Sequence, residues 1–244
     1  MSPARAAARM RQQLKARSRP SGSFDASRYF RSIDGLGFLN VGTDVVRKLA
    51  RALVRDHRDR WGVSEGLAFA DALIADRHLE VKGVGIEVLA CYRREFTPAL
   101  LPVWKRWLSN NYSANWATTD GICGSLIGPL LVAHPRLVRE MPSWSRDPNM
   151  WVRRASAVSL IPSVRRGAAL DTGYEVARRL HGDREDLLQK AVGWLLREAG
   201  KADAGRLEQY LRANGPSIPR TTVRYAIERF APAKRRELLA VTRK

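Results

Sequence analysis

Apolar residues recur at helical spacing along most of the chain, and no segment shows the strict apolar–polar alternation that predicts a strand bounded by hairpin turns. Prolines stand where one periodic segment gives way to the next, at Pro98, Pro102, Pro135, Pro142, Pro148, Pro162, Pro216 and Pro219. Because proline is excluded from helix interiors, these positions predict helix boundaries with short connections. The pattern therefore predicts an all-α protein.

An approximate repeat relates four of the predicted helices. The aliphatic residues Val81, Val152, Leu188 and Val223 follow one another at gaps of 71, 36 and 35 residues, the first gap equalling two repeats. Three of these segments follow a short acid that can cap a helix, and three carry a small residue three positions on, namely Asp76, Asp147, Asp183 and Ala155, Ala191, Ala226. The repeat predicts a HEAT-like helical solenoid with a concave basic DNA-binding face. The alternative is coincidence among ordinary amphipathic helices.

The N-terminal segment differs in composition from the rest of the chain. Its first twenty residues contain six basic residues and no acid, and SRPSGS at 18–23 interrupts the helical pattern. We therefore expect a basic, flexible arm over residues 1–22 that gains order on a phosphate backbone, and a single folded domain over residues 23–244. An organellar transit peptide is the alternative interpretation of such a segment.

Charge adds an expectation about the partner. Lys and Arg number 43 against 24 Asp and Glu, for a net charge of +19, which favours nucleic acid over a ribosome-associated or membrane-surface role. Cys91 and Cys123 lack CxxC spacing, so neither a disulfide framework nor a metal cluster is expected. No apolar run is long enough to cross a bilayer, and the N-terminal segment lacks the apolar stretch of a secretory signal. These features predict a cytoplasmic monomer that has no membrane contact.

Motifs for other chemistries are missing from the sequence. The four histidines, His57, His78, His134 and His181, are scattered without metal-ligand spacing. No P-loop occurs, and no set of serine, histidine and aspartate indicates acyl transfer. We therefore expect neither a metal nor a cofactor.

One segment combines a carboxylate with a large aromatic side chain. Trp116 and Asp120 are four residues apart, so they lie on one face of a predicted helix. Cleavage of an N-glycosidic bond develops positive charge on the sugar, which a fixed carboxylate stabilises while an indole packs on the sugar. Taken by itself, the pair favours a core tryptophan and a solvated aspartate over a catalytic pair.

Two further segments carry cations beside aromatic residues. Arg153 and Arg154 follow Trp151, and an arginine directed inward is suited to a phosphate, although solvated or acid-paired arginines are the alternative. Lys190, Trp194 and Arg197 fall on one helical stripe, as expected of a DNA-facing surface. The alternative is a core tryptophan flanked by cations that extend into solvent.

In this order the segments resemble the AlkD-like family of DNA alkylation repair glycosylases, which are built from HEAT-like repeats. The resemblance runs from about Tyr29 to about Arg229. It includes GLGFLNVGTDVVRKL near the start, the W-x-x-x-D motif of Trp116 and Asp120, WVRRA at 151–155 and KAVGWLLRE at 190–198. The last of these motifs is the most specific.

The resemblance implies a monofunctional glycosylase that excises N3- or N7-alkylated purines, bulky ones among them, from double-stranded DNA. By resemblance, Asp120 is the catalytic carboxylate, Trp116 and Trp194 contact the lesion-bearing nucleotide, and Arg154 contacts a phosphate. Arg153 can exchange roles with Arg154. Lys190 and Arg197 are expected to contact DNA, and no lysine is marked as a lyase nucleophile.

Two features depart from the family pattern. Ala117 directly follows Trp116, where relatives often carry an acid, and the basic arm is not a general family feature. The predicted repeat and the basic charge balance also support a second hypothesis of another class, namely a non-enzymatic HEAT-like scaffold that binds nucleic acid or protein by shape and charge.

Overall fold

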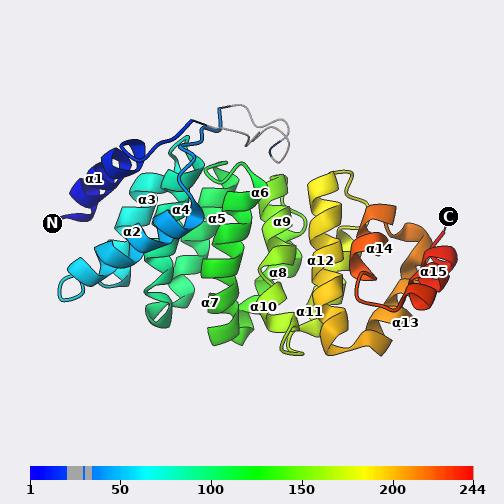
Figure 1. Cartoon of the computed structure of the whole chain (residues 1–244). Coiled ribbons are helices and arrows are strands. Elements are labelled where there is room, and N and C mark those ends of the chain that lie inside the picture. The colour runs from blue at the N-terminus through cyan, green and yellow to red at the C-terminus, as the bar shows by residue number, and fades with distance from the viewer. Residues whose placement is uncertain (21–29, 31–34, 244) are drawn as a thin grey trace. The chain divides into compact units, whose positions relative to one another are not determined.

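The computed structural model describes residues 1–20, 30 and 35–243, which form two compact units, residues 1–126 and 127–244 (Figure 1). The described residues form helices and no strand, which confirms the all-α prediction. The solenoid and its concave basic face remain predictions. The predicted domain start at Ser23 and the beginning of the resemblance at Tyr29 lie outside the described residues.

The first unit consists of helices packed around α4. Its helices are α1 (Pro3–Lys15), α2 (Thr43–Asp56), α3 (Val63–Ile74), α4 (Leu79–Ala90), η2 (Arg93–Glu95), η3 (Pro98–Leu100), α5 (Leu101–Ser109) and α6 (Trp116–Ile122). A π-helical turn, η4 (Cys123–Ile127), follows α6. Helix α4 packs against α2, α3 and α6, so it is the central element of this unit.

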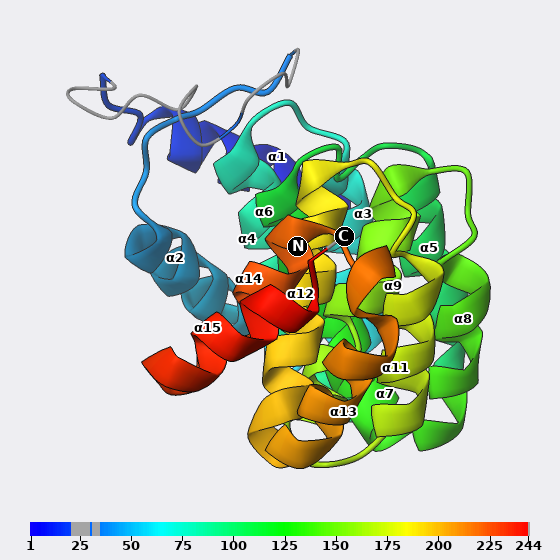
Figure 2. The ribbon, with the colours of Figure 1, turned by 90° about the vertical axis from the view of Figure 1, so that its right-hand side faces the viewer.

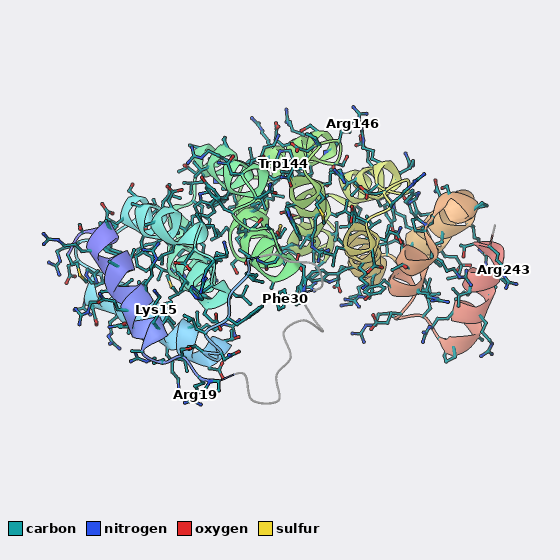
Figure 3. The ribbon with its side chains drawn as sticks, turned by 90° about the horizontal axis from the view of Figure 1, so that it is seen from above. Lys15, Arg19, Phe30, Trp144, Arg146 and Arg243 are labelled. Atoms are coloured by element: carbon teal, nitrogen blue, oxygen red, sulfur yellow. The ribbon has the colours of Figure 1, made fainter. Side chains whose placement is uncertain are left out.

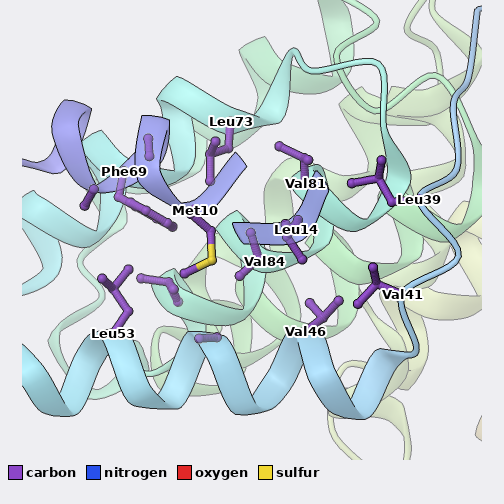
Figure 4. Packing of buried hydrophobic residues seen from close by; sticks show 14 of the residues in the cluster. Met10, Leu14, Leu39, Val41, Val46, Leu53, Phe69, Leu73, Val81 and Val84 are labelled. Atoms are coloured by element: carbon purple, nitrogen blue, oxygen red, sulfur yellow. The ribbon is translucent and has the colours of Figure 1, made fainter. Parts of the chain in front are cut away.

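Helix α1 is part of the core of the first unit. Its residues Ala6, Ala7, Met10 and Leu14 are buried in one cluster with residues of α2, α3 and α4 (Figure 4). Arg11 also pairs with Asp76 at 2.9 Å. The expectation of a flexible arm is therefore wrong for these residues. The basic composition of this segment led to the expectation of a flexible arm. Composition does not show that α1 has one apolar face, and one such face is enough for a helix to pack.

The second unit contains the longest helix of the described chain. Its helices are α7 (Gly128–Ala133), η5 (Pro135–Glu140), α8 (Met141–Trp144), α9 (Met150–Val158), α10 (Ile161–Val164), α11 (Leu170–Arg179), α12 (Asp186–Ala202), α13 (Ala204–Asn214), η6 (Gly215–Ser217), α14 (Arg220–Ala226) and α15 (Pro232–Val241). Figure 2 shows α12 among its neighbours, and it packs against α9, α10, α11, α13 and α14.

Close contact between α12 and α14 depends on Gly193. A Cβ atom at this position would lie 2.4 Å from Cβ of Tyr225 and 2.9 Å from the carbonyl oxygen of Thr222. Any side chain here would therefore push the two helices apart. Thr222 adds a hydrogen bond, because its hydroxyl donates to the Gln189 carbonyl at 2.9 Å.

The local features of the predicted repeat are present in both units. The aligned aliphatics Val81, Val152, Leu188 and Val223 are fully buried, as are the three small residues Ala155, Ala191 and Ala226. Each repeated aspartate accepts the backbone N–H two residues on, at 2.9–3.0 Å, in the pairs Asp76–His78, Asp147–Asn149 and Asp183–Glu185. The aspartates thus close a turn before the helix and do not cap its first turn as expected.

Among the residues that the structure describes, no single helix is both long and apolar enough to cross a membrane.

Candidate active site

Helix α6 presents the predicted carboxylate and indole, and its start is tightly fixed. The side chain of Asn115 accepts a hydrogen bond from the Thr118 backbone N–H at 2.8 Å and donates to the Thr118 hydroxyl at 2.9 Å. The hydroxyl of Thr119 donates to Ser113 at 3.1 Å. This N-cap satisfies backbone groups at the helix start and holds Trp116 at the first helical position.

The two faces of α6 differ in burial. Thr118, Thr119 and Ile122 are buried, whereas Trp116 and Asp120 are partly exposed. The structure thus places the indole and the carboxylate one turn apart on α6, outside the core of the first unit. From this position both side chains can contact a ligand.

One face of the Trp116 indole is covered by an aromatic ring. The ring of Phe30, which is labelled in Figure 3, stacks on it with centroids 5.3 Å apart and planes inclined by 10°. Phe38 lies against Phe30 at 5.2 Å. This contact could not be predicted from the sequence, because Phe30 and Trp116 are far apart along the chain.

A buried lysine fixes the segment that leads into α6. The ammonium group of Lys82 on α4 donates to the carbonyl of Ile74, at the end of α3, at 2.8 Å and to the carbonyl of Tyr112 at 2.6 Å. Burial lowers the pKa of Lys82 to about 8, although the nearby carboxylate of Asp76 raises it. Lys82 therefore connects α3, α4 and the start of the candidate site.

The two arginines of α9 are both held by the protein. Arg153 pairs with Asp183 at 2.8 Å and donates to the carbonyls of Asp147 and Pro148 at 3.0 and 2.9 Å. Arg154 is only 5% exposed and donates to the carbonyl of Leu187, just inside the start of α12. The two guanidinium groups are therefore fixed in different directions.

Helix α12 carries the third predicted group. Lys190 pairs with Asp186 at 2.6 Å, one turn earlier. Arg197 contacts Glu198 at 3.3 Å and also pairs with Glu228. Trp194 lies between them, partly exposed. Both cations of this stripe are therefore partly neutralised by neighbouring acids.

Glu198 is the centre of an ion cluster that the sequence motif contained but did not explain. It is 1% exposed and accepts from Arg165 at 2.7 Å and from Lys201 at 2.8 Å, besides Arg197. Burial raises the pKa of Glu198, but the hydrogen bonds from Arg165 and Lys201 outweigh it and lower the pKa to about 2. Glu198, the acid of KAVGWLLRE, thus brings Arg165 together with Arg197 and Lys201 of the C-terminal part of α12.

The predicted residues fall into two groups. Trp116 and Asp120 belong to the first unit, whereas Arg153, Arg154, Lys190, Trp194 and Arg197 belong to the second, where α9 and α12 are in contact. Across residues 1–20, 30 and 35–243, no three His, Cys, Asp or Glu side chains are grouped so that they could hold a metal ion.

The described chain is thus an all-helical protein that presents a carboxylate and an indole one turn apart on a capped helix. The family model of the DNA alkylation repair enzymes matches residues 10–230, so the chain belongs to this family, as the resemblance predicted. A solved structure described as a predicted DNA alkylation repair enzyme from Enterococcus faecalis is similar in fold, with a TM-score of 0.70. The two chains are 15% identical, and the match covers 93% of this chain and 96% of the other. A comparison with curated proteins found no match.

Proposed function

We propose that this protein is a monofunctional DNA glycosylase that hydrolyses the N-glycosidic bond of N3- or N7-alkylated purines in duplex DNA and leaves an abasic site. Its membership of the DNA alkylation repair enzyme family supports alkylated DNA as the substrate. The single observation that carries the proposed chemistry is the position of Asp120, partly exposed on α6 and one turn from Trp116.

The chemistry needs one carboxylate. An alkylated purine already carries positive charge, so the bond from C1′ to the purine nitrogen breaks with its electron pair going to the base, which leaves neutral. The sugar becomes an oxocarbenium-like cation, which the carboxylate of Asp120 stabilises. A water oxygen then bonds to C1′ and its proton passes to Asp120 or to solvent. No proton donor for the base is required.

The remaining residues are proposed to position the DNA. Trp116 and Trp194 contact the lesion-bearing nucleotide, because an indole face attracts positive charge. Arg154, or Arg153 in its place, contacts a phosphate. Lys190 and Arg197 add contacts with the backbone. Because Arg153 and Arg197 have acid partners, their contribution to binding is expected to be smaller than their formal charge implies.

Replacement of Asp120 by Asn tests the proposal. The substitution keeps the shape of the side chain and removes the charge that faces the sugar cation, so we expect base release to slow by about 100-fold or more. The assay is single-turnover release of 3-methyladenine and 7-methylguanine from methylated duplex, measured by chromatography. Duplex affinity should stay within about twofold, because Asp120 makes no favourable contact with a phosphate.

Asp59→Asn is the matched control, since Asp59 is an exposed carboxylate of the same unit whose side chain is 86% accessible. It should release base at the rate of the unmodified protein. Equal rates for Asp120→Asn and the unmodified protein would overturn the assignment of Asp120. Full duplex binding without base release from any alkylated DNA would instead favour the non-enzymatic scaffold.

A further inference from the structure

The basic residues of α12 and α13 are all neutralised by acids. Each Lys and Arg of these helices pairs with an Asp or Glu within 4.0 Å; the pairs are Lys190–Asp186, Arg197–Glu228, Lys201–Glu198, Arg206–Asp171 and Arg212–Glu208. Such cations have less charge to offer a phosphate, because the partner acid repels it. Helix α12, which carries the KAVGWLLRE motif, and helix α13 are therefore poor in uncompensated positive charge.

The segment after them is different. Apart from Arg220, whose guanidinium donates to the Leu239 carbonyl, five exposed arginines from α14 to the end of the described chain have no ion-pair partner there; we call Arg224, Arg229, Arg235, Arg236 and Arg243 the C-terminal arginine surface. The two acids of this segment are already engaged, Glu228 by Arg197 and Glu237 by Arg212 and Lys234. The surface therefore keeps its full positive charge.

Contacts between α14 and α15 bring parts of this surface together. Arg220, at the start of α14, donates to the carbonyl of Leu239 near the end of α15 at 2.7 Å. Arg224 stands one turn after Arg220, and Arg243 stands four residues after Leu239. Both therefore lie near this junction, and Figure 3 labels Arg243 beside α15. Arg235 and Arg236 lie in α15, and Arg243 follows directly after the C-cap of this helix, Thr242.

Exposed apolar side chains accompany the arginines. Tyr225 on α14 is 38% exposed, and Val241 on α15 is 42% exposed. Sugars and base edges offer apolar contacts beside each phosphate, so a duplex can cover these side chains while it pairs with the arginines. An acidic protein partner would satisfy the charge as well. The family of the chain favours DNA as the occupant.

We propose that the C-terminal arginine surface binds the phosphate backbone of duplex DNA away from the lesion and supplies affinity that does not depend on the lesion. The inference rests on the proposed function for its ligand, duplex DNA. Arg235, Arg236 and Arg243 lie beyond residues 10–230, the part of the chain that matches the family model, so this portion of the surface is additional to the matched region.

The test is the triple variant Arg235→Gln, Arg236→Gln, Arg243→Gln of the full chain. We expect its duplex affinity to fall about tenfold near 0.1 M salt, equally for undamaged and methylated DNA. The slope of log affinity against log salt should decrease in magnitude by about 0.9 for each lost phosphate contact, that is by about 2 to 3. Fluorescence anisotropy over a range of salt concentrations measures both quantities.

Arg212→Gln is the matched control, because Arg212 is 40% exposed in the same unit but is neutralised by Glu208 and Glu237. It should change the salt slope by less than half a unit. An unchanged slope in the triple variant, or an equal decrease in slope for Arg212→Gln, would overturn the proposal.

Base release at saturating protein should be the same in the triple variant and in the unmodified protein, so loss of base release in the triple variant also counts against the proposal. Absence of release in the unmodified protein contradicts the proposed function alone, since the binding measurements need no chemistry.

Discussion

Lys82 in the first unit and Glu198 in the second are both buried charged side chains, and the two units treat these charges in opposite ways. In the first unit, Lys82 has two neutral carbonyl oxygens as its acceptors. In the second unit, Glu198 has Arg165, Arg197 and Lys201 around it. Both side chains are less than a tenth exposed. The difference therefore lies in the partners, not in the depth of burial.

The pKa values show the consequence. Burial lowers the pKa of Lys82 to about 8, so the folded protein disfavours its charge. Burial also disfavours the charge of Glu198, but the cations reverse the effect and lower its pKa to about 2. The charged form of a buried group is favoured when its partners carry full opposite charges. It is disfavoured when its partners are backbone carbonyl dipoles alone. Substitutions at these two positions test this conclusion directly.

The largest expected effect on stability is that of Glu198→Gln. Removing the carboxylate leaves three cations around a neutral amide, so we expect the free energy of unfolding at pH 7 to fall by about 3 kcal/mol. The folded pKa of Glu198 lies below its ordinary value of 4.5, so its contribution is complete above that pH and is lost as pH falls towards 2. Urea unfolding at pH 7 and at pH 3 measures both effects.

Glu228→Gln provides the comparison, because Glu228 is 47% exposed and pairs only with Arg197. An exposed pair contributes about 1 kcal/mol at most. If Glu198→Gln and Glu228→Gln destabilise the protein equally, the ion cluster has no special stability and the contrast with Lys82 disappears.

The sequence predicted the helices of both units because apolar spacing and prolines are local signals. The aliphatic residues aligned in the predicted repeat, Val81, Val152 and Leu188, are fully buried, whereas the repeat itself stays a prediction. The prediction of a flexible arm was wrong for α1, because it was based on the number of arginines and not on the apolar stripe of Ala6, Met10 and Leu14, which is buried. Composition averages over a helix, whereas packing depends on one face of it.

Placement of Trp116 and Asp120 on one helix was predictable for the same local reason. The partners of the site residues were not. Nothing in the sequence links Phe30 to Trp116, Lys82 to Tyr112 or Arg153 to Asp183, because these contacts depend on how helices pack. Whether an arginine is available for DNA or bound by an acid is therefore settled only by the fold.

Lys82→Met should have an intermediate effect. Methionine matches the apolar stem of lysine but leaves the carbonyls of Ile74 and Tyr112 without a donor, which destabilises the protein. It also removes the buried charge, which offsets part of this loss. We expect a net loss of about 1 to 2 kcal/mol at pH 7. Lys48→Met is the control, since Lys48 is an exposed lysine of α2 in the same unit.

The dependence on pH has a defined sign. The folded pKa of Lys82, about 8, lies below its ordinary value of 10.5, so the unfolded chain binds more protons between these values. The unmodified protein therefore gains stability relative to Lys82→Met as pH rises from 8 to 10.5. Denaturant unfolding at pH 7, 8.5 and 10 measures the difference in unfolding free energy between the unmodified protein and Lys82→Met. If this difference becomes smaller as pH rises, the buried ammonium group is stabilised by its carbonyl partners.

The smallest expected effect is that of Lys190→Gln. Lys190 is 40% exposed and its partner Asp186 is 62% exposed, so water screens the pair and its loss should change stability by less than about 0.5 kcal/mol. Because Asp186 partly neutralises Lys190, we also expect duplex affinity to fall no more than about threefold and the salt slope to change by less than one. Unfolding and anisotropy measurements on the same variant separate the two roles. A slope change of one or more would show that Lys190 exchanges Asp186 for a phosphate on binding, and that surface pairs, unlike the buried cluster around Glu198, are open to competition from DNA.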